Sequence, residues 1–195
     1  MYCLLFYSIV SGKGTQAKLI MERLRAKGKG ENEPILYIQT GQELREFIKG
    51  ESISQKLCRD IYMAGGLMPE FLAVYTWINV LVQKFTGKET IIFDGTPRKY
   101  HEAGVFHSIL GFYKDMAKPF VINIDISSEE ALKRLMARGR LDDNEDDIKN
   151  RLSWYETEVL PAIGFFEKND AYTFLKIDGN RPVEEIFNEI VEKTG

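Results

Sequence analysis

Five short apolar runs recur along the chain and alternate with longer amphipathic stretches. The runs are rich in β-branched or aromatic side chains, and they cover residues 2–10, 35–39, 90–94, 120–126 and 172–178. Apolar runs of this length, each followed by turn or helix-start residues, are typical of strands that are buried on both faces. The pattern predicts an α/β protein of three layers, in which helices cover both faces of a five-stranded parallel sheet.

The stretches between the runs have helical periodicity, and several of them end on glycine. Extra helical sequence between the second and third runs predicts a small helical insertion at about 40–68, and a charged turn predicts a second, minimal insertion at about 134–144. The chain contains no internal repeat and no low-complexity linker, so residues 1–195 are predicted to form a single domain.

Composition and charge narrow the class of partner. The net charge of −3 over 195 residues does not favour nucleic acid or an acidic membrane surface, so the expected partner is a small molecule. Cys3 and Cys58 lack the paired spacing of a zinc site and indicate no disulfide framework. The first apolar run is too short to span a membrane and lacks the features of a signal peptide. We therefore expect a cytoplasmic protein.

The first apolar run is followed by a turn of sequence SGKGTQ, residues 11–16. A strand that ends in such a turn and continues as a helix directs backbone N–H groups and the positive helix end at one point. Lys13 adds a cation, and the hydroxyl of Thr15 can join the ligands of a phosphate-bound Mg²⁺. From these residues alone, a phosphate site and an ordinary turn with a surface lysine remain equally good interpretations.

The third apolar run ends in DGTPR, which places Asp94 at the carboxyl end of a strand. Open α/β sheets bind their ligands at that edge, so Asp94 can hold Mg²⁺ through water while the turn presents Arg98. An Asp-Gly turn with a solvated arginine is the alternative. Farther back, the residues from Thr40 to Glu43 have the spacing of a capping box and predict the start of a helix that carries Arg45.

Arginines gather after residue 130. Arg134 and Arg138 are four positions apart and share a helix face, and Arg140 and Arg151 follow. A mixed charge run is ordinarily a solvated helix face. It also meets the needs of phosphoryl transfer, which requires positive charge around the moving group, and the planar guanidinium binds phosphate oxygens in pairs.

Five motifs together resemble the adenylate kinase family of nucleoside monophosphate kinases over essentially the whole chain. They are, in order, SGKGTQ, TGQELREF, DGTPR, RLMARGR and DDNEDDIKNRLSWY. The resemblance implies the phosphate-binding-loop (P-loop) kinase fold and a reversible Mg²⁺-dependent transfer of the γ-phosphoryl group from ATP to a monophosphate. AMP is the expected acceptor, the transfer is expected to proceed by direct in-line displacement, and we expect a monomer that uses no zinc.

The resemblance also implies residue roles. ATP is expected to contact Ser11, Gly12, Lys13, Gly14, Thr15, Gln16 and Arg134. The monophosphate is expected to contact Thr40, Gly41, Arg45, Met68, Gly95, Arg98 and Glu102. The catalytic cations are expected to be Lys13, Arg98, Arg138, Arg140 and Arg151, with Thr15 and Asp94 at the metal and Asp142 and Asp143 orienting the lid arginines.

The chain departs from the family pattern at several positions. Tyr7 and Val10 replace two glycines of the loop, and bulky or β-branched residues are poorly suited to positive φ. Glu102 replaces a glutamine, and an ionised carboxylate accepts hydrogen bonds but donates none. These departures leave open a kinase directed to GMP or a pyrimidine nucleotide, a weakened kinase, and a nucleotide-binding relative without turnover. Trp77 and Trp154 are interpreted as packing residues.

Overall fold

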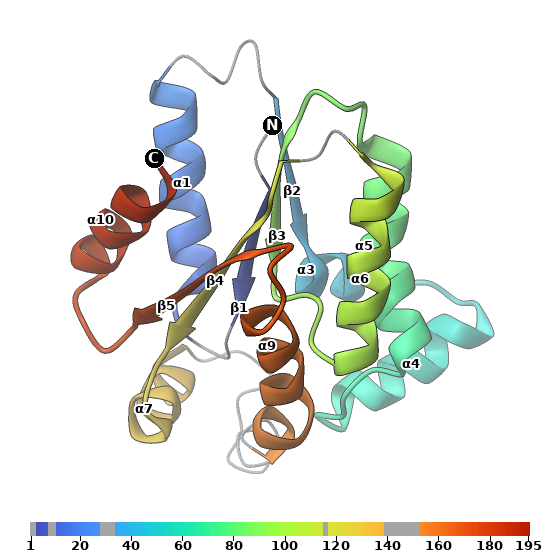
Figure 1. The fold of residues 1–195 in the computed structure, drawn as a ribbon. Coiled ribbons are helices and arrows are strands. Elements are labelled where there is room, and N and C mark those ends of the chain that lie inside the picture. Colours follow the sequence, from blue (N-terminus) through green and yellow to red (C-terminus); the bar gives the residue numbers. More distant parts are fainter. Residues whose placement is uncertain (1–2, 8–10, 28–33, 115–116, 139–152) are drawn as a thin grey trace.

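The computed structural model describes residues 3–7, 11–27, 34–114, 117–138 and 153–195 (Figure 1). Its five strands are β1 (Cys3–Tyr7), β2 (Ile35–Gln39), β3 (Thr90–Asp94), β4 (Phe120–Asp125) and β5 (Thr173–Asp178). They form one sheet of order β2-β3-β1-β4-β5 in which every neighbouring pair is parallel. The predicted five-stranded parallel sheet is therefore confirmed.

The described helical elements are α1 (Lys13–Ala26), α3 (Thr40–Phe47), α4 (Ile53–Met63), α5 (Glu70–Lys84), α6 (Tyr100–Phe112), α7 (Ser128–Arg138), the π-helical segment η1 (Tyr155–Val159), α9 (Leu160–Glu167) and α10 (Val183–Thr194). Figure 1 shows α1 and α10 on one face of the sheet and α5, α6 and α9 on the other. The predicted three-layer arrangement is confirmed.

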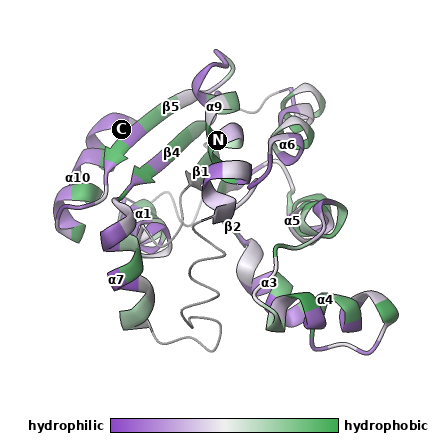
Figure 2. Ribbon diagram, turned by 90° about the horizontal axis from the view of Figure 1, so that it is seen from below, coloured by the Kyte–Doolittle hydropathy of each residue, from purple (hydrophilic) through white to green (hydrophobic). Residues whose placement is uncertain are grey.

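Two separate cores hold the layers together, because side chains of one strand alternate between the faces of the sheet. Leu5 and Cys3 of β1 belong to the core under α5, α6 and α9, whereas Leu4 between them belongs to the core under α1 and α10. Figure 2 shows the apolar colouring of β4 between these two helical layers. The continuous apolar runs in the sequence thus reflect strands that bury both faces.

Trp77 fills the centre of the first core. Its side chain is fully buried on α5, and its ring centroid lies 6.0 Å from that of Phe93 in an edge-to-face arrangement. Phe106 of α6 lies 5.9 Å away on the same side of the sheet. The interpretation of Trp77 as a packing residue is therefore confirmed.

The helices between β2 and β3 include α3 and α4, which contribute to a small cluster of their own. Cys58, Met68 and Leu72 form its buried centre. The start of α4 has a capping box, in which the backbone N–H of Gln55 donates to Ser52 Oγ and the Gln55 side chain accepts from the Ser52 N–H. The domain limits and the binding role of this insertion stay predictions.

The capping box that the sequence predicts at Thr40 is wrong. Helix α3 starts at Thr40 itself, its N-cap is Gln39, and no side chain caps it. The physical reason is that β2 runs directly into the helix, so Thr40 is already a helical residue and lies one position too late to act as the N-cap. Its hydroxyl is left for another partner.

Candidate active site

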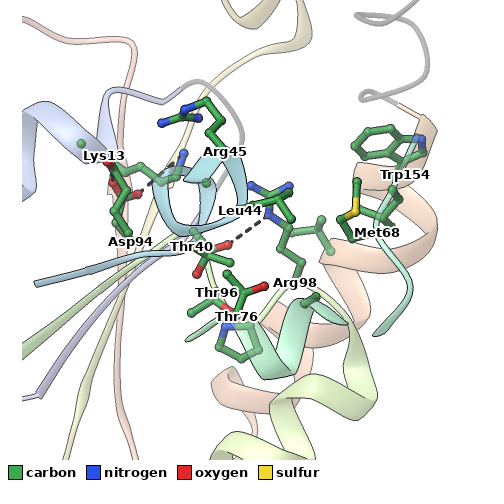
Figure 3. Close-up of a pocket in the computed structure, with 18 of the residues that line it drawn as sticks. Lys13, Thr40, Leu44, Arg45, Met68, Thr76, Asp94, Thr96, Arg98 and Trp154 are labelled. Carbon is green, nitrogen blue, oxygen red and sulfur yellow. Dashed lines mark hydrogen bonds and ion pairs between the residues drawn. The ribbon is translucent and has the colours of Figure 1, made fainter. Parts of the chain in front are cut away.

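The candidate site lies at the carboxyl edge of the sheet, where β1 and β3 are neighbours. From β1 the chain passes through α1 over one face of the sheet to β2, and from β3 it passes through α6 over the other face to β4 (Figure 1). Such a reversal of strand order opens a crevice in which open α/β sheets bind ligands. A pocket of about 510 Å³ occupies this crevice (Figure 3).

One end of the pocket is formed by the turn that starts α1. Gly12 has φ of 82°, a left-handed conformation that favours glycine, and its carbonyl oxygen accepts from the N–H groups of Thr15 and Gln16 at 2.9 and 3.0 Å. The positive end of α1 therefore faces the pocket, which Gly12, Lys13, Gly14 and Thr15 line. This end of the pocket suits a phosphate group.

Two predicted ATP contacts from the same motif are buried behind the pocket. Ser11 is 1% exposed and its hydroxyl has no hydrogen-bond partner among the described residues. Gln16 is equally buried, and its Nε2 donates to the carbonyl oxygen of Val183 at 2.9 Å, where α10 begins. Neither side chain lines the pocket within the described part of the chain. Gln16 instead joins α1 to the start of α10.

Asp94 is buried at the end of β3 beside this phosphate end. Its Oδ2 accepts from the hydroxyl of Tyr37 at 2.7 Å and from Gln39 Nε2 at 3.1 Å, while its Oδ1 lies 3.9 Å from Lys13 Nζ. Burial and the charge of Asp94 raise the pKa of Tyr37 well above its usual value, so Tyr37 remains a neutral donor. Hydrogen bonds to Oδ2 therefore fix the orientation of the carboxylate, while Oδ1 faces the ammonium group of Lys13.

The sequence interpretation missed Tyr37 and Gln39. Both residues lie on β2, which pairs with β3 in a register that sets Gln39 opposite Asp94. The available signal was two polar side chains, two positions apart, at the end of an otherwise apolar run. The order of the strands in the sheet is decided by the tertiary structure. These two polar residues therefore could not be assigned to Asp94 from the sequence.

A divalent cation fits the arrangement around Asp94. Its Oδ1 is buried without a hydrogen bond from any described residue, and Thr15 lines the same pocket. A single carboxylate with a hydroxyl is the type of site in which Mg²⁺ keeps most of its ligands from water and phosphates. In the described ranges, no three His, Cys, Asp or Glu side chains gather into a closed metal cage.

Arg45 and Arg98 line the pocket from different elements. Arg45 lies on α3, and Arg98 follows the turn after β3, where its Nε donates to the carbonyl oxygen of Gly95 at 3.0 Å. Gly95 has φ of 79°, and a Cβ atom there would lie 3.2 Å from Lys13 Cε. A glycine at this position therefore lets the lysine and the arginine approach the same space.

Arg134 lies on α7 and reaches the pocket from the β5 side. Its Nε donates to Glu130 Oε1 at 2.7 Å, and its Nη2 donates to the carbonyl oxygen of Gly179 at 2.9 Å. These two hydrogen bonds fix the plane of the guanidinium against the loop that follows β5. A fixed planar cation of this kind can stack on a flat ligand group.

The far end of the pocket is largely apolar. Met68 and Trp154 line it (Figure 3), and Thr40, Gly41, Leu44 and Glu102 also belong to the lining of the pocket. Figure 3 shows Trp154 and Met68 on the same wall, away from Lys13 and Asp94. The interpretation of Trp154 as a packing residue is therefore incomplete, because its half-buried indole also faces the pocket.

Several predicted site residues fall outside the described part of the chain. They are Val10, Arg140, Asp142, Asp143 and Arg151, together with the side chains of Tyr7 and Arg138. Their roles stay predictions. Among the described residues, the pocket is lined by the turn before α1, by α3 and by the turn after β3. It therefore joins residues that are up to about ninety positions apart in the sequence.

The class of protein follows from three features of the fold and the pocket. These are the order of the strands, the strand-to-helix turn that carries Lys13, and the carboxylate and arginines that line the same pocket. Together they define a P-loop phosphotransferase. A model of the family described as adenylate kinase matches residues 8–171. The adenylate kinase of Parabacteroides distasonis is 33% identical over 186 residues, which are 93% of this chain and 91% of that protein. The adenylate kinase of Leptospira biflexa is 34% identical over 186 residues, with 93% of each chain covered.

The chain belongs to the adenylate kinase family. This confirms the predicted class, a nucleoside monophosphate kinase, and it favours phosphoryl transfer between ATP and AMP over the alternatives that the departures left open. Mg²⁺ use is general in this family, so a magnesium cofactor is supported at the level of the family. In the described ranges, no helix is both long enough and apolar enough to cross a bilayer.

Proposed function

We propose that the pocket at the carboxyl edge of the sheet carries out this reaction, with ATP on the α1 side and AMP on the side of α3. The observation that carries the assignment is the convergence of Lys13, Arg45, Arg98 and the buried Asp94 on one pocket. Phosphoryl transfer requires no protein nucleophile, because positioning and positive charge around the moving group supply most of the catalysis. The transfer is a direct in-line displacement.

On the donor side, the start of α1 and Lys13 bind the phosphates of ATP. Arg134, held by Glu130 and by the Gly179 carbonyl, packs on the adenine. Thr15 and Asp94 would hold Mg²⁺, directly or through water, and the ion would supply positive charge beside the phosphates. Tyr37 and Gln39 keep the Asp94 carboxylate turned toward this ion.

On the acceptor side, Arg45 and Arg98 bind the phosphate of AMP, and its base enters the apolar end of the pocket. Thr40, Gly41, Met68, Gly95 and Glu102 surround that ligand. The sequence adds Arg138, Arg140 and Arg151 as a clamp on the transferred group, with Asp142 and Asp143 orienting them. The helical insertion at about 40–68 binds the monophosphate, and the lid at about 134–144 closes by a small movement.

The enzyme is proposed to act as a cytoplasmic monomer on ATP and AMP, with Mg²⁺ and without zinc. Neither nucleic acid nor a membrane is a partner in this proposal, in keeping with the net charge of −3.

A steady-state assay with ATP-Mg²⁺ against AMP, GMP, CMP, UMP and dTMP tests the proposed function. ADP formation with AMP as the best acceptor is the expected result, measured as the ratio of kcat/KM values. A failure to phosphorylate any of the five monophosphates, with ATP still bound, would favour the relative without turnover.

Replacing Arg98 should mainly impair use of the monophosphate. In Arg98→Ala, the KM for AMP is expected to rise about 10- to 100-fold, because a charged hydrogen-bond pair to phosphate is lost, while the KM for ATP changes little. Arg25→Ala, at the exposed end of α1, is the matched control and should behave as wild type. An unchanged KM for AMP in Arg98→Ala would remove this residue from the acceptor site.

Replacing the two bulky residues of the loop should change ATP affinity and thermal stability in opposite directions. Tyr7→Gly/Val10→Gly should bind ATP more tightly and melt at a lower temperature, because glycine frees the path of the phosphates but removes packing and adds unfolded-state entropy. ATP titrations and melting curves of the double variant beside wild type and Tyr7→Phe measure both effects. A double variant that binds ATP no more tightly than wild type would show that the loop cradles the phosphates in another way.

A further inference from the structure

Glu102 is a buried carboxyl group on the wall of the pocket. It lies in the first turn of α6, is 2% exposed, and lines the pocket together with Met68 and Trp154. Its Oε2 accepts from the backbone N–H of Arg98 at 2.9 Å. Within the described part of the chain, this is its only hydrogen bond and no ion pair accompanies it. A buried carboxylate without a paired cation is costly unless it takes up a proton.

The surroundings of Glu102 favour its neutral form. Burial has the largest influence and raises the pKa of Glu102 above its usual value; Arg98 and Lys99 act in the opposite direction, and Glu70 of α5 adds to the increase. Glu70 in turn lies 3.5 Å from the Nδ1 of His101. These are the charged groups that reach Glu102 from its own helix, from the turn before it and from α5.

The backbone of Arg98 connects Glu102 with the acceptor phosphate. One residue donates its backbone N–H to Glu102 and turns its guanidinium toward the phosphate end of the pocket. With the phosphate of a nucleoside monophosphate on that guanidinium, the base extends toward Glu102 and the apolar wall. This step rests on the proposed function, because it takes AMP as the ligand of this part of the pocket.

A neutral carboxylic acid has one O–H donor and one carbonyl acceptor, which are the same functions that a side-chain amide offers. The Watson–Crick edge of adenine presents an acceptor, ring N1, next to a donor, the exocyclic amino group. The edge of guanine presents two neighbouring donors, which suit an ionised carboxylate. The protonation state of one side chain can therefore decide between the two purines.

We propose that Glu102 binds the adenine of AMP as a neutral carboxylic acid, so that AMP binding is linked to a bound proton. The Oε1–H group donates to ring N1, and Oε2 accepts from the amino group while it keeps the Arg98 N–H. At a pH where Glu102 is ionised in the free protein, AMP binding takes up one proton. Affinity for AMP then falls as pH rises, by as much as about tenfold per pH unit, and affinity for GMP does not.

Calorimetric titration of the full chain with AMP, in two buffers of different ionisation enthalpy at pH 6 to 9, measures this proton directly. The phosphate of AMP titrates in the same range, so ribose 5-phosphate, which lacks the base, is the reference ligand for wild type. Glu102→Gln is the reference protein, since its amide has the same functions but no ionisable proton. We expect wild type to take up as much as one more proton with AMP than either reference.

The preference for AMP over GMP should fall with pH in wild type and stay constant in Glu102→Gln. His101→Gln controls for the histidine that pairs with Glu70, and it should retain the proton uptake of wild type. Equal proton uptake by wild type and Glu102→Gln, or by AMP and ribose 5-phosphate in wild type, would overturn the proposal, as would an absence of AMP binding at every pH. The comparison in wild type holds even if Glu102→Gln fails to fold.

The same samples separate this proposal from the proposed function. AMP that binds with uptake of a proton but is not phosphorylated by ATP-Mg²⁺ would support the role of Glu102 and count against the kinase reaction. AMP that is phosphorylated without any linked proton would support the kinase and overturn the role of Glu102.

Discussion

Lys13→Met should lower kcat by about 100- to 1,000-fold, because it removes the cation nearest to the proposed phosphate end of the pocket. Lys13 begins α1, and its ammonium group lies 3.9 Å from Asp94 Oδ1. Methionine keeps the length and most of the packing of the side chain but carries no charge. The loss should therefore fall on turnover, measured in a coupled assay at saturating ATP and AMP, and melting curves should change little.

Lys84→Met is the matched control for this substitution. Lys84 is exposed in the last turn of α5 and is not among the residues that line the pocket, so its loss should leave kcat unchanged. If Lys13→Met retained turnover within about threefold of wild type, the charge of Lys13 would contribute little in the transition state. The assignment of the phosphate end would then be wrong.

Asp94→Asn is expected to lower kcat about 100-fold and to raise the Mg²⁺ concentration needed for half of the maximal rate. The carboxylate uses Oδ2 for Tyr37 and Gln39 and leaves Oδ1 for the proposed ion. Asparagine has nearly the same shape but no negative charge, so the local packing should persist. Rates measured over a series of Mg²⁺ concentrations report both effects.

Tyr37→Phe separates the charge of Asp94 from its orientation. This variant removes the hydroxyl that donates to Oδ2 at 2.7 Å and leaves the carboxylate and Gln39 in place. It should reduce kcat far less than Asp94→Asn, and the Mg²⁺ dependence should stay close to that of wild type. Equal effects of the two substitutions would indicate that position, and not charge, is what Asp94 contributes.

The strands could be predicted from the sequence because each buries both of its faces. A strand such as β3, in which every residue from Thr90 to Asp94 is buried, produces a continuous apolar run that stands out from its surroundings. The helical stretch before β5 was less predictable. It contains a π-helical segment, Tyr155–Val159, ahead of α9, and the periodicity of the sequence does not distinguish the two helix types.

The local geometry of the turn before α1 was also predictable. Gly12, Lys13 and Thr15 lie next to one another at the start of a helix, so the motif that contains them largely determines the local geometry. The error at Thr40 came from the same kind of local reasoning, since the pattern of a capping box does not reveal that β2 runs directly into α3. A shift of one residue changed the hydroxyl from a cap into a buried group that lines the pocket.

Contacts between distant segments depended on the tertiary structure. The hydrogen bonds of Asp94 with Tyr37 and Gln39 exist because β2 lies next to β3, and that of Gln16 with Val183 exists because α10 packs beside α1. Likewise, Trp154 faces the pocket although, apart from Val159, the other lining residues are distant from it along the chain.

By itself, the sequence determined the class of fold and the family, and it supplied the residues that we propose to bind phosphate. Strand burial and motif spacing both depend on the order of neighbouring residues, so they can be recognised without the tertiary structure. The sequence also contained the replacement at Glu102, but not the meaning of that replacement. Only the tertiary structure decided that this carboxyl is 2% exposed and bonded to the Arg98 N–H. The physical reason is that the free energy of a charge depends on the solvent and dipoles around it, which distant parts of the chain supply on folding.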